Sequence, residues 1–258
     1  MELFDSLCHL DDPAFDQDRA QVLQDARRNG VRQLLVPGVA ASGWTGITEL
    51  CRDDDGLFPA LGLHPAFLEQ HERSDIELLE QMIAQQRPTA IGEIGLDFFI
   101  PQPDRDGQQA LFEAQLEIAR SADLPVVLHV RKAHDQVLAA LRRIRVTGGT
   151  AHAFNGSFQQ AQQYIDMGFK LGFGGTLTYA RSRKIRALAR DLPLDALVLE
   201  TDAPDIVVAP HRGERNSPEY LTDCLQSLAE IRNEAPEYLA AQTTANARAV
   251  FRLDASLQ

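Results

Sequence analysis

The chain has 258 residues, of which 44% are hydrophobic and 24% are charged, so it can bury a sizeable core and is not expected to be disordered. Its formal net charge of −12 argues against a module that only coats nucleic acid, because such binding depends on basic residues that neutralise phosphates. No apolar stretch is long enough to span a bilayer, so no membrane partner is expected. The first residues lack a basic leader, and the three cysteines are too widely spaced for a disulfide framework. Both features predict a cytoplasmic protein with reduced thiols.

Short apolar runs alternate with amphipathic stretches along the chain, and eight of these runs are predicted as strands. They are mostly apolar without clean alternation, as expected of strands that are buried on both faces. In chain order the predicted strands are Leu3–Cys8, Gln33–Pro37, Phe58–Leu63, Thr89–Ile94, Pro125–Val130, Gly149–Ala153, Lys170–Phe173 and Ala196–Glu200.

Helical patterns with recognisable start signals lie between the predicted strands. Ser74-Asp-Ile-Glu77 and Ser157-Phe-Gln-Gln160 match the capping box, in which two side chains satisfy the first backbone N–H groups of a helix. Pro218 is predicted at the first position of a later helix, and a last helix is predicted over Pro236–Phe251. The stripe of the helix after Pro218 that is predicted to face the core consists of Leu221, Cys224, Leu225 and Leu228.

Eight strands that alternate with helices are compatible with a closed barrel or with an open doubly wound sheet. The count of eight favours the barrel, and so does the absence of a Gly-x-Gly-x-x-Gly turn after the first strand. No linker, low-complexity stretch or preserved repeat interrupts the pattern. We therefore predict an α/β fold with a single (β/α)8 TIM-barrel domain over residues 1–258.

Polar side chains are dense at the carboxyl ends of the predicted strands, which is the end of such a barrel where active sites lie. Taken singly, a histidine after a strand is more often structural, and a carboxylate there can cap the next turn. Together, imidazoles and carboxylates that converge on one rim are what a divalent metal centre needs. The strand-end residues are Asp5, His9, His64, Glu93, Asp97, His129, Arg131, His152, Asn155, Glu200 and Asp202.

Six segments in chain order carry a resemblance to a known family. They are Asp5-Ser-Leu-Cys-His9-Leu-Asp11, Gly62-Leu-His64-Pro65, Gly92-Glu93-Ile-Gly-Leu-Asp97, Leu124-Pro-Val-Val-Leu-His129-Val-Arg131, His152-Ala-Phe-Asn-Gly156 and Glu200-Thr-Asp202-Ala-Pro204. With Arg215-Asn-Ser-Pro218 beyond them, the chain resembles the TatD-type deoxyribonucleases of the amidohydrolase superfamily over nearly its whole length.

The resemblance implies a TIM barrel of the metallo-dependent hydrolase type that holds one or two divalent metal ions, Mg, Mn or Zn. It implies that His9 binds the first ion, that Glu93 bridges both, and that His129 and His152 hold the second. Asp202 completes the first set and acts as the general base for a metal-activated water. The implied activity is a 3'-5' exonuclease-like hydrolysis of phosphodiester bonds.

The substrate that the resemblance implies is DNA, as single strands or frayed ends, and no obligate protein partner is evident. The implied substrate-binding residues, most of which would contact phosphates, are His64, Arg131, Asn155, Arg212 and Arg215.

Position 7 departs from the family pattern, whose opening motif is His-x-His. Here Leu7 stands where the first histidine is expected. Because side chains alternate along a strand, Leu7 and His9 should both face the site, whereas Cys8 should face away. Leucine cannot bind a metal, so we expect the first metal position to be weakened.

Two other interpretations stay open. The same metals and carboxylate would serve an ester or amide hydrolase, such as an aminoacyl-tRNA deacylase. Alternatively, Leu7 leaves a catalytically weakened barrel that binds a ligand without turnover.

Some charged residues and histidines are expected to be solvated. His71 and His134 lie in or beside helical stretches, and we expect both side chains to face solvent. A basic cluster after the seventh strand is expected to be a solvated helix face rather than a nucleic-acid contact; it consists of Arg181, Arg183, Lys184 and Arg186.

Overall fold

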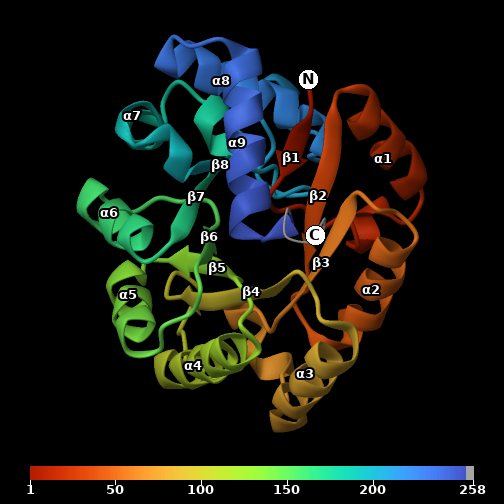
Figure 1. The fold of residues 1–258 in the computed structure, drawn as a ribbon, viewed down its shortest axis with the longest axis vertical. Helices are drawn as coiled ribbons and strands as arrows, with labels where there is room; N and C mark the ends of the chain where they lie inside the picture. The colour runs from red at the N-terminus through yellow and green to blue at the C-terminus, as the bar shows by residue number, and fades with distance from the viewer. Residues whose placement is uncertain (254–258) are drawn as a thin grey trace.

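A ring of parallel strands, surrounded by helices, forms the centre of the molecule (Figure 1). The computed structural model describes residues 1–253. Each strand is hydrogen-bonded to the next one along the chain, in the order β1 to β8. The strands are β1 (Leu3–Asp5), β2 (Val31–Pro37), β3 (Leu57–Leu61), β4 (Ala90–Asp97), β5 (Val126–Arg131), β6 (Gly149–Ala151), β7 (Phe169–Phe173) and β8 (Leu197–Leu199).

Backbone hydrogen bonds just beyond β1 and β8 bring the two ends of the sheet together. The Ser6 N–H donates to the Leu199 carbonyl at 2.9 Å, and the Asp202 N–H donates to the Leu7 carbonyl at 2.9 Å. The fold is a (β/α)8 TIM barrel, so the predicted fold class is confirmed. All eight predicted strands are present, but β1 ends at Asp5 because the chain leaves the regular ladder there.

Helices lie outside the strands and connect each to the next (Figure 1). They are α1 (Arg19–Arg28), α2 (Trp44–Arg52), α3 (Arg73–Gln86), α4 (Arg105–Ala122), α5 (His134–Arg143), α6 (Phe158–Asp166), α7 (Arg183–Asp191), α8 (Leu221–Arg232) and α9 (Pro236–Val250). The predicted last helix is confirmed, as is the core-facing stripe of α8, whose four residues are all buried.

The first turns of α6 and α3 can be compared with the capping boxes predicted from the sequence. The box at the start of α6 is confirmed, because the Gln160 N–H donates to Ser157 Oγ at 3.1 Å and the Ser157 N–H donates to Gln160 Oε1 at 2.9 Å. The predicted box at Ser74 is wrong. Helix α3 begins at Arg73, and its box joins Glu72 to Asp75, whose carboxylate accepts the Glu72 N–H at 2.8 Å. Pro218 begins a short 3₁₀ turn (Pro218–Tyr220) that leads into α8.

The interior of the barrel is apolar and is closed at the amino end of the strands. Its buried cluster includes Leu7 and one or more side chains from most of the strands; its members are Phe4, Leu7, Leu35, Ala60, Ala90, Val127, Val198, Ala247 and Phe251. Helix α9 crosses this end of the barrel (Figure 1), and the Phe251 ring that follows it stacks on Phe4 at 6.0 Å between centroids. The barrel is therefore a packed core that leaves only its carboxyl end for a site.

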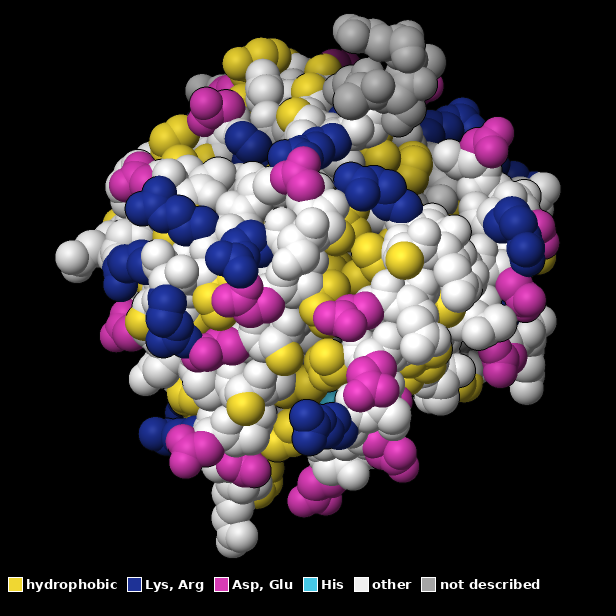
Figure 2. Space-filling view, turned by 60° about the horizontal axis from the view of Figure 1, so that its bottom comes forward, with side chains coloured by type: hydrophobic (Ala, Val, Ile, Leu, Met, Phe, Trp, Pro, Cys, Tyr) yellow, Lys and Arg dark blue, Asp and Glu magenta, His cyan; other side chains and the backbone are white. Residues whose placement is uncertain are grey.

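The surface and the cysteines agree with the composition. On the side of the molecule that carries α3 and α4, positive and negative side chains are intermixed around a strip of hydrophobic ones (Figure 2). No helix within residues 1–253 is long and apolar enough to cross a membrane. Cys8, Cys51 and Cys224 are buried free thiols, which confirms the absence of a disulfide framework among them.

Candidate metal centre

A cavity of about 690 Å³ opens at the carboxyl ends of the strands. It brings together residues that lie at or just beyond the carboxyl ends of all eight strands and that are far apart in the sequence. Its lining includes His9, Asp11, Asp12, His64, Phe67, Glu93, His129, Arg131, His152, Asn155, Asp202 and Asp205.

Glu93 lies at the centre of this group and is 2% exposed. Its Oε1 atom is 2.9 Å from His129 Nδ1 and 3.4 Å from His64 Nε2. Its Oε2 atom is 3.4 Å from His9 Nε2. The two carboxylate oxygens therefore face different histidines, as a carboxylate that bridges two sites must.

His129 and His152 form one half of the site, at the ends of β5 and β6. The outer nitrogen of each ring donates to a buried carboxylate: His129 Nε2 to Asp97 Oδ2 and His152 Nδ1 to Glu200 Oε1, both at 3.0 Å. The other nitrogens, His129 Nδ1 and His152 Nε2, face the cavity, and each would present a lone pair once it loses its proton to a bound metal. A carboxylate behind a histidine fixes the ring and makes it a better metal ligand.

His9 and Asp202 form the other half, beyond the ends of β1 and β8. His9 Nδ1 donates to the Pro37 carbonyl at 3.3 Å, so Nε2 is the nitrogen that faces the cavity, 3.6 Å from Asp202 Oδ1. Asp202 has a left-handed backbone (φ 57°), a conformation that costs free energy and is concentrated at functional sites. Behind it, the buried Asp5 carboxyl accepts the Thr201 N–H at 2.9 Å and contacts Thr201 Oγ1 at 2.5 Å.

His64 differs from the other three histidines in the proton that it presents. Its Nδ1 accepts the Ala66 N–H at 3.1 Å, so in the neutral ring the proton is on Nε2, which faces Glu93. Burial is the largest cause that lowers its pKa, to about 4, which keeps the ring neutral. His64, Glu93 and His129 are close enough to hold a metal together, but a protonated nitrogen suits a hydrogen bond to an oxygen better than metal binding.

The charges of the metal-free site balance through protonated histidines. Burial opposes ionisation of every group, yet the carboxylates around His152 raise its pKa well above its usual value, and Glu93 raises that of His9 to about 9. Against the effect of burial, the imidazoles of His64, His152 and His129 hold the pKa of Glu93 well below its usual range. Burial raises the pKa of Asp202 to about 6 despite His152 and His9 nearby.

The residues present fit a divalent metal. Imidazole nitrogens and carboxylate oxygens surround one small volume, and a bound cation would replace the imidazole protons that otherwise balance the carboxylates. Glu93, His129 and His152 offer three donors on one side. Glu93, His9 and Asp202 offer three on the other.

Leu7 adds no donor to the second set. It is 0% exposed and belongs to the apolar cluster inside the barrel, beneath the cavity rather than in its lining. Cys8 faces the other way, as expected: its Sγ lies 3.9 Å from the Ala203 carbonyl among the side chains between strands and helices.

Of the predicted substrate-binding residues, His64, Arg131 and Asn155 line the cavity, and Arg212 and Arg215 do not. Arg215 instead pairs with both carboxylate oxygens of Asp18, at 2.9 and 2.7 Å. A role for Arg212 and Arg215 in phosphate binding stays a prediction.

The expectation that the side chains of His71 and His134 face solvent is wrong. His134 is buried between Tyr164 and Asn155, each 3.3 Å from one ring nitrogen. His71 donates to the His64 carbonyl at 2.9 Å. The sequence did not lead us to predict that Asp97 and Glu200 accept hydrogen bonds from site histidines. Each carboxylate is an even number of residues from a site residue at the end of the same strand, a spacing that places both side chains on one face.

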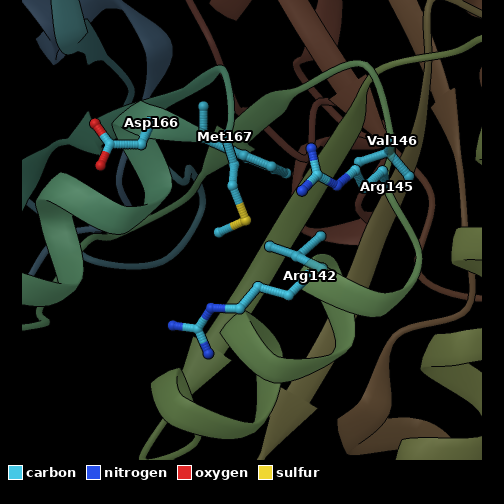
Figure 3. A pocket seen from close by; sticks show the side chains of 7 residues that line it. Arg142, Arg145, Val146, Asp166 and Met167 are labelled. Atoms are coloured by element: carbon cyan, nitrogen blue, oxygen red, sulfur yellow. The ribbon is translucent and has the colours of Figure 1, made fainter.

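A second cavity lies at the opposite end of the barrel and lacks such a donor set. It measures about 280 Å³ and lies between the end of α5 and the turn from α6 into β7 (Figure 3). Arg142, Arg145 and Asp166 are its charged lining residues. Because the amino end of a barrel serves stability, we assign it no chemistry.

The fold and the cavity together define a metal-dependent hydrolase built on a TIM barrel. A family model described as "TatD related DNase" matches residues 4–252. The chain belongs to this TatD family.

Relatives and a solved structure agree with that assignment. The chain is 39% identical to the uncharacterized metal-dependent hydrolase YjjV of Escherichia coli (strain K12), over 96% of this chain and 97% of that protein. It is 35% identical to the 3'-5' ssDNA/RNA exonuclease TatD of Pantoea sp. (strain At-9b), over 97% of this chain and 100% of that protein. The crystal structure of the Escherichia coli YjjV protein, a TatD homologue, superposes with a TM-score of 0.94 at 38% identity, over 97% and 98% of the two chains.

Proposed function

We propose that this protein hydrolyses phosphodiester bonds at the ends of DNA, as a 3'-5' exonuclease that acts on single strands or frayed ends. The observation that carries the proposal is the division of labour among four histidines. In three of them a backbone carbonyl or a carboxylate holds one ring nitrogen, so the other can serve a metal beside Glu93, whereas His64 presents an N–H. The exonuclease name of the Pantoea relative supports the choice of substrate.

Each residue has a role in this scheme. Glu93, His129 and His152 would hold one divalent ion, and Glu93, His9 and Asp202 a second; Mg, Mn and Zn all accept such ligands to different degrees. When bound, the metal supplies an activated water and offsets negative charge on the phosphoryl oxygens. Asp202 would accept the proton of the attacking water, because its carboxylate lines the cavity where the water would be held.

The phosphate needs donors of its own. His64 Nε2–H and the Arg131 guanidinium both face the cavity and can each donate to a non-bridging oxygen. A neutral donor such as His64 orients the phosphate without adding a further cation beside the metals. Asn155, on the far side of the cavity, contributes an amide.

Release of nucleotides from an end-labelled single-stranded DNA tests the proposal, with Mg²⁺, Mn²⁺ or EDTA in parallel. We expect shortening from the 3' end that depends on metal and stops in EDTA. Hydrolysis of an acyl ester but not of bis(p-nitrophenyl) phosphate would instead favour an aminoacyl-ester hydrolase. Absence of both activities in folded, metal-loaded protein would favour a barrel that binds without turnover.

A further inference from the structure

We propose that the rim of the cavity beyond β3, β4 and β5 binds the bases and phosphates of a single-stranded polynucleotide. Phe67, Phe99, Arg131 and Lys132 form this surface, which we call the aromatic–basic rim. The inference rests on the proposed function and assigns the residues that hold the strand beyond the phosphate that is cut.

Two phenylalanines are exposed here although most phenylalanines of the chain are buried. Phe67 is 39% exposed and Phe99 is 54% exposed. Within residues 1–253 the other exposed phenylalanine is Phe158, at the start of α6. Single exposed rings are ordinary, but two rings at the mouth of a candidate active site mark a surface that binds something.

The two rings stand on neighbouring loops. Phe67 belongs to the short 3₁₀ segment Pro65–Gln70 after β3, lines the cavity, and lies 5.5 Å from the His64 ring. Phe99 follows β4, and its N–H donates to Asp97 Oδ1 at 2.9 Å. Because β3 and β4 pair directly, both rings lie on the same side of the mouth.

Two cations accompany Phe99. The Arg131 Cζ is 4.4 Å and the Lys132 Nζ is 4.6 Å from the centre of its ring. Arg131 also lines the cavity and remains 48% exposed. A guanidinium beside a phenyl ring offers a flat surface to a base and N–H donors to a phosphate, the combination found where single strands bind without sequence preference.

The charges around the mouth of the cavity favour one exit path for a bound polynucleotide. Asp11, Asp12 and Asp205 line the cavity on the β1–β8 side, where they repel a polyanion. The outer face over α3 and α4 carries charges of both signs and no continuous basic track (Figure 2). A strand with its terminal phosphate at Glu93 therefore leaves over the aromatic–basic rim.

Binding of a base-containing and an abasic oligonucleotide of equal length tests the proposal. Fluorescence anisotropy with metal-loaded protein and phosphorothioate linkages, which resist hydrolysis, separates binding from turnover. We expect the base-containing strand to bind at least about 5-fold more tightly, since one stacked base contributes about 1–3 kcal/mol, or about 5- to 160-fold. Phe99→Leu should reduce that ratio several-fold and Phe99→Trp should restore it, whereas Tyr238→Leu, an exposed ring on α9, should leave it unchanged.

Equal affinities for the two strands in the native protein would overturn the proposal, and so would a ratio that survives both Phe67→Leu and Phe99→Leu. Neither outcome depends on catalysis. The phosphodiesterase assay with bis(p-nitrophenyl) phosphate, which has no base to stack, decides separately whether the proposed function fails. The thermal midpoint of each variant shows that it is folded.

Discussion

The β5–β6 half and the β1–β8 half of the candidate metal centre share Glu93 but are supported differently. Behind His129 and His152 stand two buried carboxylates, each 3.0 Å from a ring nitrogen. Behind His9 stands only a backbone carbonyl, and Leu7, at the position where the sequence pattern leads us to expect a second histidine, lies in the apolar cluster beneath the cavity. In the proposed scheme the first half would supply a complete set of oriented ligands, whereas the second half would lack one.

Because of this difference, we expect the two halves to bind metal with unequal affinity. Carboxylates behind a histidine strengthen its metal affinity, whereas a missing ligand weakens the set that it leaves. We therefore expect the β5–β6 half to fill first as metal is added. The β1–β8 half should fill only at higher metal concentration, with Asp202 as its one unshared carboxylate.

The largest expected effect comes from breaking both halves at once. Glu93→Gln removes the charge that both sets share, so metal content and phosphodiesterase activity should fall by more than the about 10- to 100-fold typical of losing an outer partner. Elemental analysis after dialysis and the rate with bis(p-nitrophenyl) phosphate measure this. Glu69→Gln, at an exposed glutamate, is the matched control. A Glu93→Gln protein that retained its full metal content would contradict the bridging role.

A smaller effect should follow from removing the support of one half. Glu200→Gln turns an amide toward His152 Nδ1–H, and Asp97→Asn does the same to His129, so the tightest metal site should weaken by about 10- to 100-fold. Titration with Mn²⁺ reports the change. Asp106→Asn, on the exposed start of α4, should leave both sites as they are. If the tight site were unaffected and the weak one lost, the assignment of the halves would be reversed.

Leu7→His should make the two halves more alike. An added imidazole should raise the affinity of the weaker site by about tenfold, the lower end of the effects seen around metal ligands. Without metal the buried ring should cost about 1–3 kcal/mol of stability, because it lacks a hydrogen-bond partner. Metal titration and urea unfolding in EDTA measure the two effects. Leu7→Ala controls for lost packing and should gain no affinity; equal metal binding by Leu7→His and native protein would refute the idea.

The smallest expected effect concerns Asp5, which supports the β1–β8 half through Thr201. Burial raises its pKa from 3.8 to about 8, against the opposing hydrogen bonds from Thr201 and Leu7. Between pH 4 and 8 the native state therefore holds a proton that the unfolded state has lost, so stability falls as the pH rises through this window. One proton contributes at most about 1.4 kcal/mol per pH unit.

Asp5→Asn should flatten that slope, because the amide mimics the protonated carboxyl and can donate to Thr201 Oγ1. Urea unfolding in EDTA at several pH values between 5 and 8 measures it. Asp195→Asn, at an exposed aspartate, should keep the native slope. An unchanged slope in Asp5→Asn would show that Asp5 is ionised in the folded protein.

The sequence was sufficient to predict the strands and the polar residues at their carboxyl ends, because both depend on local patterns. Each strand is an apolar run, and the parallel order brings the residues after every run to one end of the barrel. The support behind the histidines was not predictable in the same way. Asp97 reaches His129 only through the register of β4 on β5, in which Gly95 pairs with His129. His134 is buried by Tyr164 from α6, a contact that no local pattern encodes.

The closed amino end of the barrel has a kinetic consequence. Phe4 and Phe251 pack together in the apolar core at this end, so the cavity does not continue through the barrel and opens only at the carboxyl end. A polymer cannot thread through it, and a strand can present only its terminus to Glu93. A nucleotide released by hydrolysis would have to leave through the same opening that the remaining strand still occupies. For the exonuclease proposed above, each turnover would require the strand to back out or shift aside. We therefore expect distributive action, in which the enzyme releases its polymer often rather than moving along it.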